Sequence, residues 1–574
     1  MRSSRSGSAA SSPHAKGCPR APVRERDPRR LRVPVTSHGG AVSSQTEIEL
    51  KFLVPPSSRA ALAAEMGRGS ATLERRTLAT VYLDTVDRRL ARSGIAWRMR
   101  REGRRWIQTL KAGGSSALER FEHEVIRPDA TWNAGAHADT AVGDRLLGIL
   151  GDAHDEGIEV GARFKTEVRR TARRIRTRGS VVEVAFDEGR LLAGEARERI
   201  REVEFELISG SARAMLRLVE RWRNRFGLIY DPRSKAERGD RLSDGSSFPP
   251  VRKAHHPDYS DEATATEALG LVLDECLAQI TRNAIGLIEG DPGSRVEHVH
   301  QMRVGIRRLR SALRSFADWT PAPPDALVDG LRALFAALGE SRDSDVLDTG
   351  VAAELVRVGA PALTVPVGAP GPDPVDAFRA DAVQRLFVAW IDWRASLAEP
   401  PASQPSERGA SETDASGVEA LTAAVHVGAA DGGQAGEPPR PGDNAKSFHR
   451  NIERRLRKWH RRIAGDAKAF GELEDEHLHL VRKRVKRQRY AVEFFAPVLG
   501  RRKVERYLGP LAAIQDRMGE LNDLYVARVR YQAFVASEPA AWFALGWLAA
   551  RIEEVRAFAK PELERLAKTD PPTR

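Results

Sequence analysis

The sequence has few cysteines, few aromatic residues and no long apolar run. Its only cysteines are Cys18 and Cys276, which excludes a disulfide scaffold and a Cys-rich zinc site and predicts a reducing compartment. The most apolar stretch, Pro539–Ala550, is shorter than the about 20 residues that a membrane-spanning helix needs, so it predicts a buried helix. The chain is 574 residues long, with 41% hydrophobic, 6% aromatic and 30% charged residues. This composition predicts a soluble globular protein, and the length predicts several domains.

Positive charge is in excess. Lys and Arg number 92 against 79 Asp and Glu, which gives a net charge of +13 and predicts polyanionic partners. Part of the excess lies in residues 1–44, where Lys and Arg far outnumber acids and no hydrophobic period is present. We expect this segment to be a disordered basic tail.

Residues 45–245 alternate with period two, which predicts a β domain. In Glu47–Phe52 the odd positions are polar and the even positions apolar, so each strand has one charged and one apolar face. Short linking helices are predicted at Ser57–Met66 and Ala212–Phe226. If the charged faces converge, the strands form a barrel with an apolar exterior and a charged interior.

Such an interior needs compensating ions, because an unpaired buried charge is costly. Arg and Lys fit a multiply charged anion, and clustered carboxylates fit hard divalent cations such as Mg²⁺ or Mn²⁺. Together they predict a site for a metal–polyphosphate complex. His123, between two glutamates on the apolar face, is interpreted as structural.

A series of short motifs runs along the β domain in this order: Glu47-x-Glu49-x-Lys51, Tyr82-Leu-Asp84-Thr85, Gly94-Ile-Ala-Trp97-Arg98-Met-Arg100, Thr109-Leu-Lys111, Arg120-Phe-Glu122, Phe164-Lys165-Thr166, Val182-Glu183 to Gly189, Glu202-Val-Glu204-Phe-Glu206 and Ser234-Lys235-Ala-Glu237-Arg238-Gly239. In these motifs the chain resembles the CYTH, or triphosphate tunnel metalloenzyme, family. The resemblance implies an eight-stranded antiparallel tunnel that hydrolyses triphosphates with Mg²⁺ or Mn²⁺.

The resemblance also implies roles for individual residues. The implied metal ligands are Glu47, Glu49, Glu122, Asp187, Glu204 and Glu206. The implied phosphate-binding residues are Lys51, Arg98, Arg100, Lys111, Arg120, Lys165, Arg169 and Lys235. Among these, the residues expected to carry catalysis are Glu47, Glu49, Lys51, Arg98 and Arg100.

After a linker at residues 246–260, residues 261–566 show a helical period, interrupted by a predicted disordered insertion at 399–444. This region contains an internal repeat, because His300–Arg310 recurs as His479–Arg489 at an offset of 179 residues. In each copy His and basic residues form one stripe of a helix and apolar residues another. Two basic stripes with few acids between them favour binding of a linear polyanion.

The repeated His-x-x-Arg pattern resembles the CHAD domain, which is often fused behind CYTH. The resemblance implies a pseudo-two-fold helical bundle that binds inorganic polyphosphate. The residues implied in that binding are His300, Arg303, Arg307, Arg308, Arg310, His479, Arg482, Lys486, Arg487 and Arg489.

The sequence thus predicts an α+β chain, with a tunnel barrel followed by an all-α bundle. It resembles bacterial CYTH–CHAD inorganic triphosphatases, which implies hydrolysis of inorganic triphosphate to diphosphate and phosphate. A cytoplasmic location is expected, with association with polyphosphate granules, no membrane partner and no specific nucleic-acid partner. Two alternatives stay open: a CYTH enzyme acting on thiamine triphosphate or ATP, and a non-enzymatic protein that binds polyphosphate granules.

Overall fold

The computed structural model describes residues 42–68, 72–114, 116, 118–346, 351–361, 373–398 and 445–574. Most of the predicted basic tail and the predicted insertion at 399–444 lie outside the described residues. The first strand begins at Val42, so residues 42–44, which were assigned to the tail, belong to the sheet.

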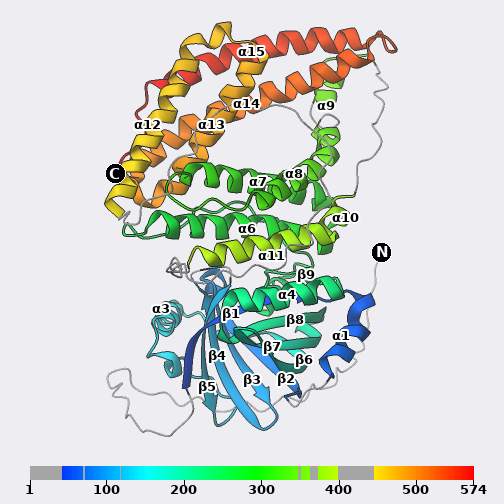
Figure 1. The fold of residues 1–574 in the computed structure, drawn as a ribbon, viewed down its shortest axis with the longest axis vertical. Helices are drawn as coiled ribbons and strands as arrows, with labels where there is room; N and C mark the ends of the chain where they lie inside the picture. The colour runs from blue at the N-terminus through cyan, green and yellow to red at the C-terminus, as the bar shows by residue number, and fades with distance from the viewer. Residues whose placement is uncertain are drawn as a thin grey trace, which may run out of the picture. The chain divides into compact units, whose positions relative to one another are not determined.

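The N-terminal region is a closed antiparallel barrel of eight strands, as predicted (Figure 1). The neighbour order is β5-β4-β3-β2-β6-β7-β8-β1, and pairing of β1 with β5 closes the ring. A short ninth strand, β9, adds to β1. The strands are β1 (Val42–Leu53), β2 (Glu74–Thr85), β3 (Ile95–Glu102), β4 (Arg105–Gly113), β5 (Glu119–Arg127), β6 (Val160–Thr177), β7 (Ser180–Ala193), β8 (Ala196–Gly210) and β9 (Ile229–Tyr230).

Part of the exterior of the barrel is apolar and covered by helices. In β1, Leu50 and Phe52 are buried in an outer cluster with Leu218 and Trp222 of α4 (Ala212–Phe226). The other helices of this region are α1 (Arg59–Met66), α2 (Arg89–Arg92), α3 (Ala141–Asp155) and α5 (Lys235–Ser243). Thus α1 and α4 confirm the two linking helices predicted from the sequence.

Helix α5 packs against β6, β7 and β8, and its first residues, Lys235 and Ala236, face the interior of the barrel. Its Leu242 joins Tyr82, Phe164 and other side chains in an apolar cluster. Gly239 lies directly on the Phe164 ring, where an added Cβ would come within 2.1 Å of that ring. A side chain at this position would therefore push the helix away from β6.

The C-terminal region is helical. Its helices are α6 (Ala265–Glu289), α7 (Arg295–Phe316), α8 (Asp325–Val346), α9 (Ala352–Arg357), α10 (Pro374–Arg379), α11 (Asp381–Ser396), α12 (Ala445–Ala469), α13 (Asp475–Phe495), α14 (Arg501–Phe534) and α15 (Ala541–Ala567). None of the helices in the described ranges is long and apolar enough to cross a membrane.

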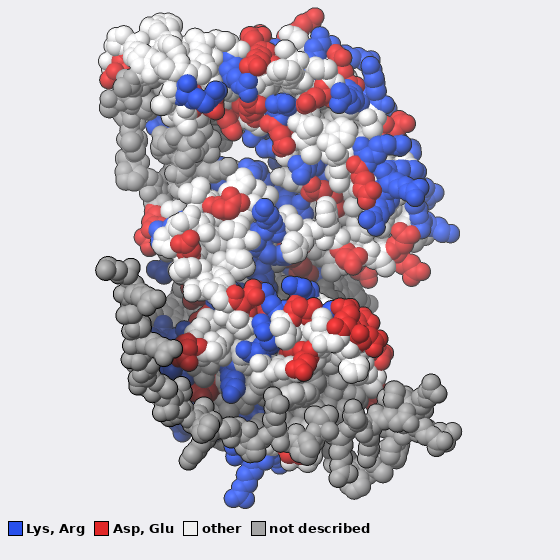
Figure 2. All heavy atoms as spheres, turned by 180° about the vertical axis from the view of Figure 1, so that it is seen from behind, with Lys and Arg blue, Asp and Glu red and all other residues white. Residues whose placement is uncertain are grey.

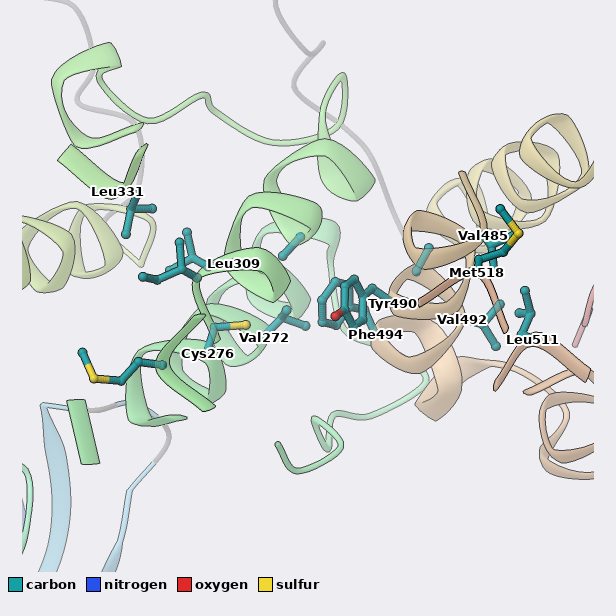
Figure 3. Packing of buried hydrophobic residues seen from close by; sticks show 14 of the residues in the cluster. Val272, Cys276, Leu309, Leu331, Val485, Tyr490, Val492, Phe494, Leu511 and Met518 are labelled. Atoms are coloured by element: carbon teal, nitrogen blue, oxygen red, sulfur yellow. The ribbon is translucent and has the colours of Figure 1, made fainter. Parts of the chain in front are cut away.

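The internal repeat is visible in the helix boundaries. Helix α6 begins at residue 265 and α12 at residue 445, an offset within one residue of that between the sequence motifs, and α7 corresponds to α13. A single apolar cluster joins both halves, and Tyr490 and Phe494 of α13 lie where the halves meet (Figure 3). Helix α11 also contributes Val388 and Ile391 to the outer cluster of the barrel.

A buried histidine pair lies outside the tunnel. His123 of β5 and His137 are 2% and 0% exposed, and their Nδ1 atoms are 2.9 Å apart. The Gln108 side-chain amide donates to the backbone oxygen of Asn133 and lies 2.9 Å from His137 Nε2. If Gln108 also donates to Nε2, then His137 must donate from Nδ1 to His123, so both rings are neutral. This supports the structural interpretation of His123.

The histidine pair predicts an acid-sensitive barrel. Burial lowers the pKa of His137 to about 4, so between about pH 6.5 and pH 4 the unfolded chain binds more protons than the folded one. Stability should therefore be lost as the pH falls through this window, by about 1–2 kcal/mol between pH 7 and pH 5. Urea unfolding followed at both pH values should show a smaller loss in His137→Gln than in the wild type. The exposed His154→Gln is the control, and an equal pH dependence in all three proteins would contradict this role of His137.

Candidate functional site

The inner faces of the barrel strands enclose a cavity of about 330 Å³. Its acidic lining residues are Glu47, Glu49, Glu102, Glu122, Glu124, Glu183, Asp187, Glu204 and Glu206. Its basic lining residues are Lys51, Arg76, Arg98, Arg100, Lys111, Arg120, Arg170 and Lys235. Strand alternation contributes to this lining, as in β1, where Glu47, Glu49 and Lys51 lie two positions apart and share the inner face. The predicted charged interior is therefore present.

One part of the cavity is rich in carboxylates. Glu47 and Glu122 share the Lys111 ammonium, at 3.0 and 2.8 Å, and Arg120 contacts Glu49 at 2.5 Å. Burial raises the pKa of Glu47 to about 9, although Lys111 opposes the shift. Burial also raises the pKa of Glu206 to about 7, helped by neighbouring carboxylates that include Glu49. This part of the cavity therefore holds more carboxylates than its own cations can keep ionised.

Arginines line a second part. Arg98 contacts Glu122 at 3.2 Å, and Arg100 contacts Glu102 and Glu124 at 2.8 and 3.0 Å. Burial lowers the pKa of Arg100, and the nearby Arg98 lowers it further. Guanidinium groups gathered in a buried site are the arrangement that suits several phosphate oxygens.

A third cluster is centred on Lys235, the first residue of α5. Its ammonium lies 2.8 Å from Asp187, 2.5 Å from Glu202 and 2.7 Å from Glu204. The oxygens of these three carboxylates lie within 4.8 Å of one another, a spacing that could hold a metal ion. The ammonium already occupies that position, and Arg170 also pairs with Asp187 and Glu204. The cluster that could hold a metal ion thus includes Asp187 and Glu204, two of the predicted metal ligands.

The structure brings together most of the residues predicted from the sequence. All six predicted metal ligands line the cavity, as do Lys51, Arg98, Arg100, Lys111, Arg120 and Lys235. Lys165 and Arg169 are exceptions. Both are exposed, because β6 directs Thr166, Val168 and Arg170 inward and the odd positions outward. Their assignment as phosphate-binding residues is therefore wrong.

Five charged residues line the cavity but were not predicted as site residues from the sequence: Arg76, Glu102, Glu124, Arg170 and Glu183. Arg169 and Arg170 are adjacent, so composition alone could not decide which one faces inward. If Thr166 and Val168 are placed on the inner face of the strand, then alternation also places Arg170 there. Thr166 and Val168 carry no charge, however, so the sequence gives little reason to place them inside.

The carboxylate-rich part fits a divalent cation. Glu47, Glu49 and Glu206 supply hard oxygen donors, which Mg²⁺ and Mn²⁺ prefer. Burial raises the pKa of Glu47 and of Glu206, so the ionised form of each needs more positive charge nearby than the lining residues supply. A bound cation would supply the missing positive charge.

The helical region carries the second candidate site, on α7 and α13. Arg303 lies over the Phe335 ring at 4.5 Å, and His479 Nδ1 lies 3.2 Å from the Asn522 oxygen. Burial lowers the pKa of Arg482, and the approach of Arg307 from the other half contributes. Like charges from the two halves therefore lie near each other.

Arg308 does not belong to this site. It is 3% exposed, and its guanidinium contacts Glu493 at 2.6 Å and lies 5.2 Å from the centre of the Phe494 ring. Being one residue beyond Arg307, it points about 100° away, into the contact between the halves. Its assignment as a polyphosphate-binding residue is wrong.

Arg489 also pairs with Glu493, at 2.9 Å, and Arg487 lies 5.6 Å from the centre of the Trp459 ring. Of the other predicted residues, Arg310 is half-buried, and its pKa is lowered by burial and then by Arg314.

The Lys235 cluster predicts a large difference between two lysines that the sequence analysis treated alike. Lys235→Met should destabilise the barrel by about 3 kcal/mol or more, because it leaves buried carboxylates unpaired. Lys165→Met should change stability by less than about 0.5 kcal/mol, because Lys165 is exposed on the outer face. Urea unfolding of both variants at pH 7 measures the difference. If Lys235→Met unfolds at the wild-type midpoint, the cluster does not depend on Lys235.

Comparison with known proteins gives matches to both regions. The family model of the CYTH domain matches residues 45–239, and that of the CHAD domain matches residues 271–532. A curated relative, the inorganic triphosphatase of Haemophilus influenzae, is 30% identical over 200 residues, which are 34% of this chain and 54% of that protein. The match thus spans about half the length of the curated relative.

Two solved structures are also similar. The CHAD domain from the plant Ricinus communis is 27% identical, with 55% of this chain and 96% of that chain covered and a TM-score of 0.38. A protein from Hippeastrum, described as a putative adenylyl cyclase with a dominant triphosphatase activity, is 20% identical, with 35% and 98% covered and a TM-score of 0.26. On the two family matches, this chain contains a CYTH domain followed by a CHAD domain.

Proposed function

We propose that the barrel hydrolyses inorganic triphosphate to diphosphate and phosphate with the help of divalent cations. The observation that carries the proposal is the closed barrel with a carboxylate-rich part beside an arginine-rich part. The CYTH match and the identity to an inorganic triphosphatase support the choice of substrate.

The lining residues have distinct proposed roles. Lys51, Arg98 and Arg100 bind and orient the phosphate oxygens, and Glu47, Glu49 and Glu206 hold the cations, with Glu122 beside them. Bound Mg²⁺ or Mn²⁺ would neutralise phosphate charge and activate water. Pairing within the lining keeps these residues in place before the substrate binds, since Lys111 holds Glu47 and Glu122.

Two alternatives make different predictions. Another CYTH substrate, such as thiamine triphosphate or ATP, would be hydrolysed faster than inorganic triphosphate. A non-enzymatic granule-binding protein would release phosphate from none of them. A phosphate-release assay over these substrates and longer polyphosphates, with and without Mg²⁺, separates the three cases.

Removing one carboxylate should abolish most of the activity. Glu49→Gln keeps the size of the side chain and removes its charge, so we expect triphosphate hydrolysis to fall at least about 100-fold, or about 2.7 kcal/mol in the barrier. Glu167→Gln on the outer face of β6 is the matched control and should be as active as the wild type. Phosphate release measures both. Full wild-type activity in excess EDTA would exclude the metal-dependent mechanism.

We further propose that the helical region binds inorganic polyphosphate through α7 and α13, and thereby associates with polyphosphate granules. The convergence of Arg307 and Arg482 supports this, because two guanidinium groups near each other in a partly buried site favour a bridging anion. Arg303, Arg310 and Lys486 lie on the same two helices and extend the basic surface.

The double variant Arg307→Ala, Arg482→Ala tests this site. Its affinity for long-chain polyphosphate should fall at least about tenfold, or about 1.4 kcal/mol. Hydrolysis of triphosphate in the barrel should be unchanged. Arg217→Ala, Arg221→Ala removes two exposed arginines of α4 and should have little effect. Titration with labelled polyphosphate measures both, and equal losses would show that net charge alone drives binding.

A further inference from the structure

Helix α12 has an exposed surface made almost entirely of cations. Apart from Gly465, all its exposed residues are Lys or Arg: Lys446, Arg450, Arg454, Arg457, Lys458, Arg461, Arg462 and Lys468. The two acids of the helix form ion pairs, Glu453 with Arg457 of the same helix and Asp466 with Arg484 of α13. Figure 2 shows Lys and Arg gathered at the edge of the helical region where α12 runs.

A comparison of the two halves shows that the repeated fold does not require this basic surface. Helix α6 occupies the same place in the first half, and its exposed residues are Glu267 and Glu289. At the position of Arg450, α6 has Gly270, whose backbone oxygen accepts a hydrogen bond from Arg394 of α11 at 2.9 Å. The first half therefore covers this face with another helix, whereas α12 presents it to solvent.

The cations of α12 repel one another. Arg450, Arg454, Lys458 and Arg462 succeed one another at four-residue intervals, so like charges are neighbours along the helix. Within the described ranges, Arg450, Lys458 and Arg461 form no ion pair. An exposed helix needs polar residues for solubility, but it does not need one sign of charge. A bound anion would relieve the repulsion.

A hollow of about 530 Å³ connects α12 to the end of α7. It is lined by Arg314 of α7, by Arg454 and Lys458 of α12, and by Trp319 and Trp459. Its single acid, Asp318, pairs with Arg455 at 2.8 Å, and Arg455 also donates to the backbone oxygens of Ser315 and Ala317. Arg455 is thus a structural residue, and the other three cations face the hollow.

Each aromatic ring of the hollow has a guanidinium group beside it. Arg455 lies 3.9 Å from the centre of the Trp319 ring, and Arg487 lies 5.6 Å from the centre of the Trp459 ring. A single-stranded nucleic acid binds such surfaces by stacking its bases on free aromatic faces. Guanidinium groups on these rings favour an anion without bases.

We infer that α12 and the hollow at Arg314 form a second binding surface for an extended inorganic phosphate chain, continuous with the α7 site. This inference rests on the proposed polyphosphate binding and extends it. Arg314 ends the basic stripe of α7 and begins the hollow, so a chain that follows α7 reaches α12 without leaving cationic surface. From Arg450 to Arg462 the α12 surface is about 18 Å long.

The test compares two matched pairs of cations in the full chain. Arg454→Gln, Lys458→Gln removes two charges four residues apart on α12, and Arg217→Gln, Arg221→Gln removes two at the same spacing on α4. The α12 pair should weaken binding of long-chain polyphosphate about three- to tenfold and flatten its salt dependence. The α4 pair should leave both unchanged. Triphosphate hydrolysis and thermal unfolding should be the same in both variants and in the wild type.

The possible outcomes are distinct. If Arg307→Ala, Arg482→Ala weakens binding and the α12 pair does not, the α7–α13 site stands and the second surface is excluded. If neither matters, the proposed polyphosphate function fails as well. If single-stranded DNA competes as well as polyphosphate at equal phosphate concentration, the surface is a nucleic-acid site and the identity of the ligand inferred here is wrong.

Discussion

The mutual neutralisation of buried charges holds the tunnel together. A closed barrel with charged residues on its inner face would be strongly destabilised if those charges were unpaired. Lys111 between Glu47 and Glu122, and Lys235 among Asp187, Glu202 and Glu204, remove that penalty in the absence of ligand. The same pairs allow partners to be exchanged when a ligand binds. A bound cation can replace the lysine beside each carboxylate, and a phosphate can replace the carboxylate beside each lysine. Binding can thus proceed without exposing an unpaired charge.

The helical region shows how a duplicated fold diverges. Both halves keep the basic helix, α7 or α13, and the apolar cluster that joins them. They differ in the preceding helix, since α6 is covered by neighbours and α12 is free on one face. Only a free face can change its charge without disturbing the core, so α12 is the helix on which a new function could develop.

The sequence predicted the barrel and most of its lining because charged and apolar residues alternate in segments such as Glu47–Phe52 of β1 and Glu202–Glu206 of β8, which places them on opposite faces. It failed in β6, where Arg169 and Arg170 follow each other and only the strand register decides that Arg170 faces Asp187. It also failed at Arg308, because a motif match does not show that a residue is turned toward Glu493. Strand register and the partners of long side chains are set by the tertiary structure, so a local sequence pattern does not predict them.

The packing of Gly239 against Phe164 has a consequence for the charges in the cavity. Helix α5 begins at Lys235, which lines the cavity, and Gly239 sets how closely this helix approaches β6. A side chain at position 239 would shift the helix and with it the Lys235 ammonium relative to its three carboxylates. A residue that does not line the cavity thus controls the spacing of charges inside it.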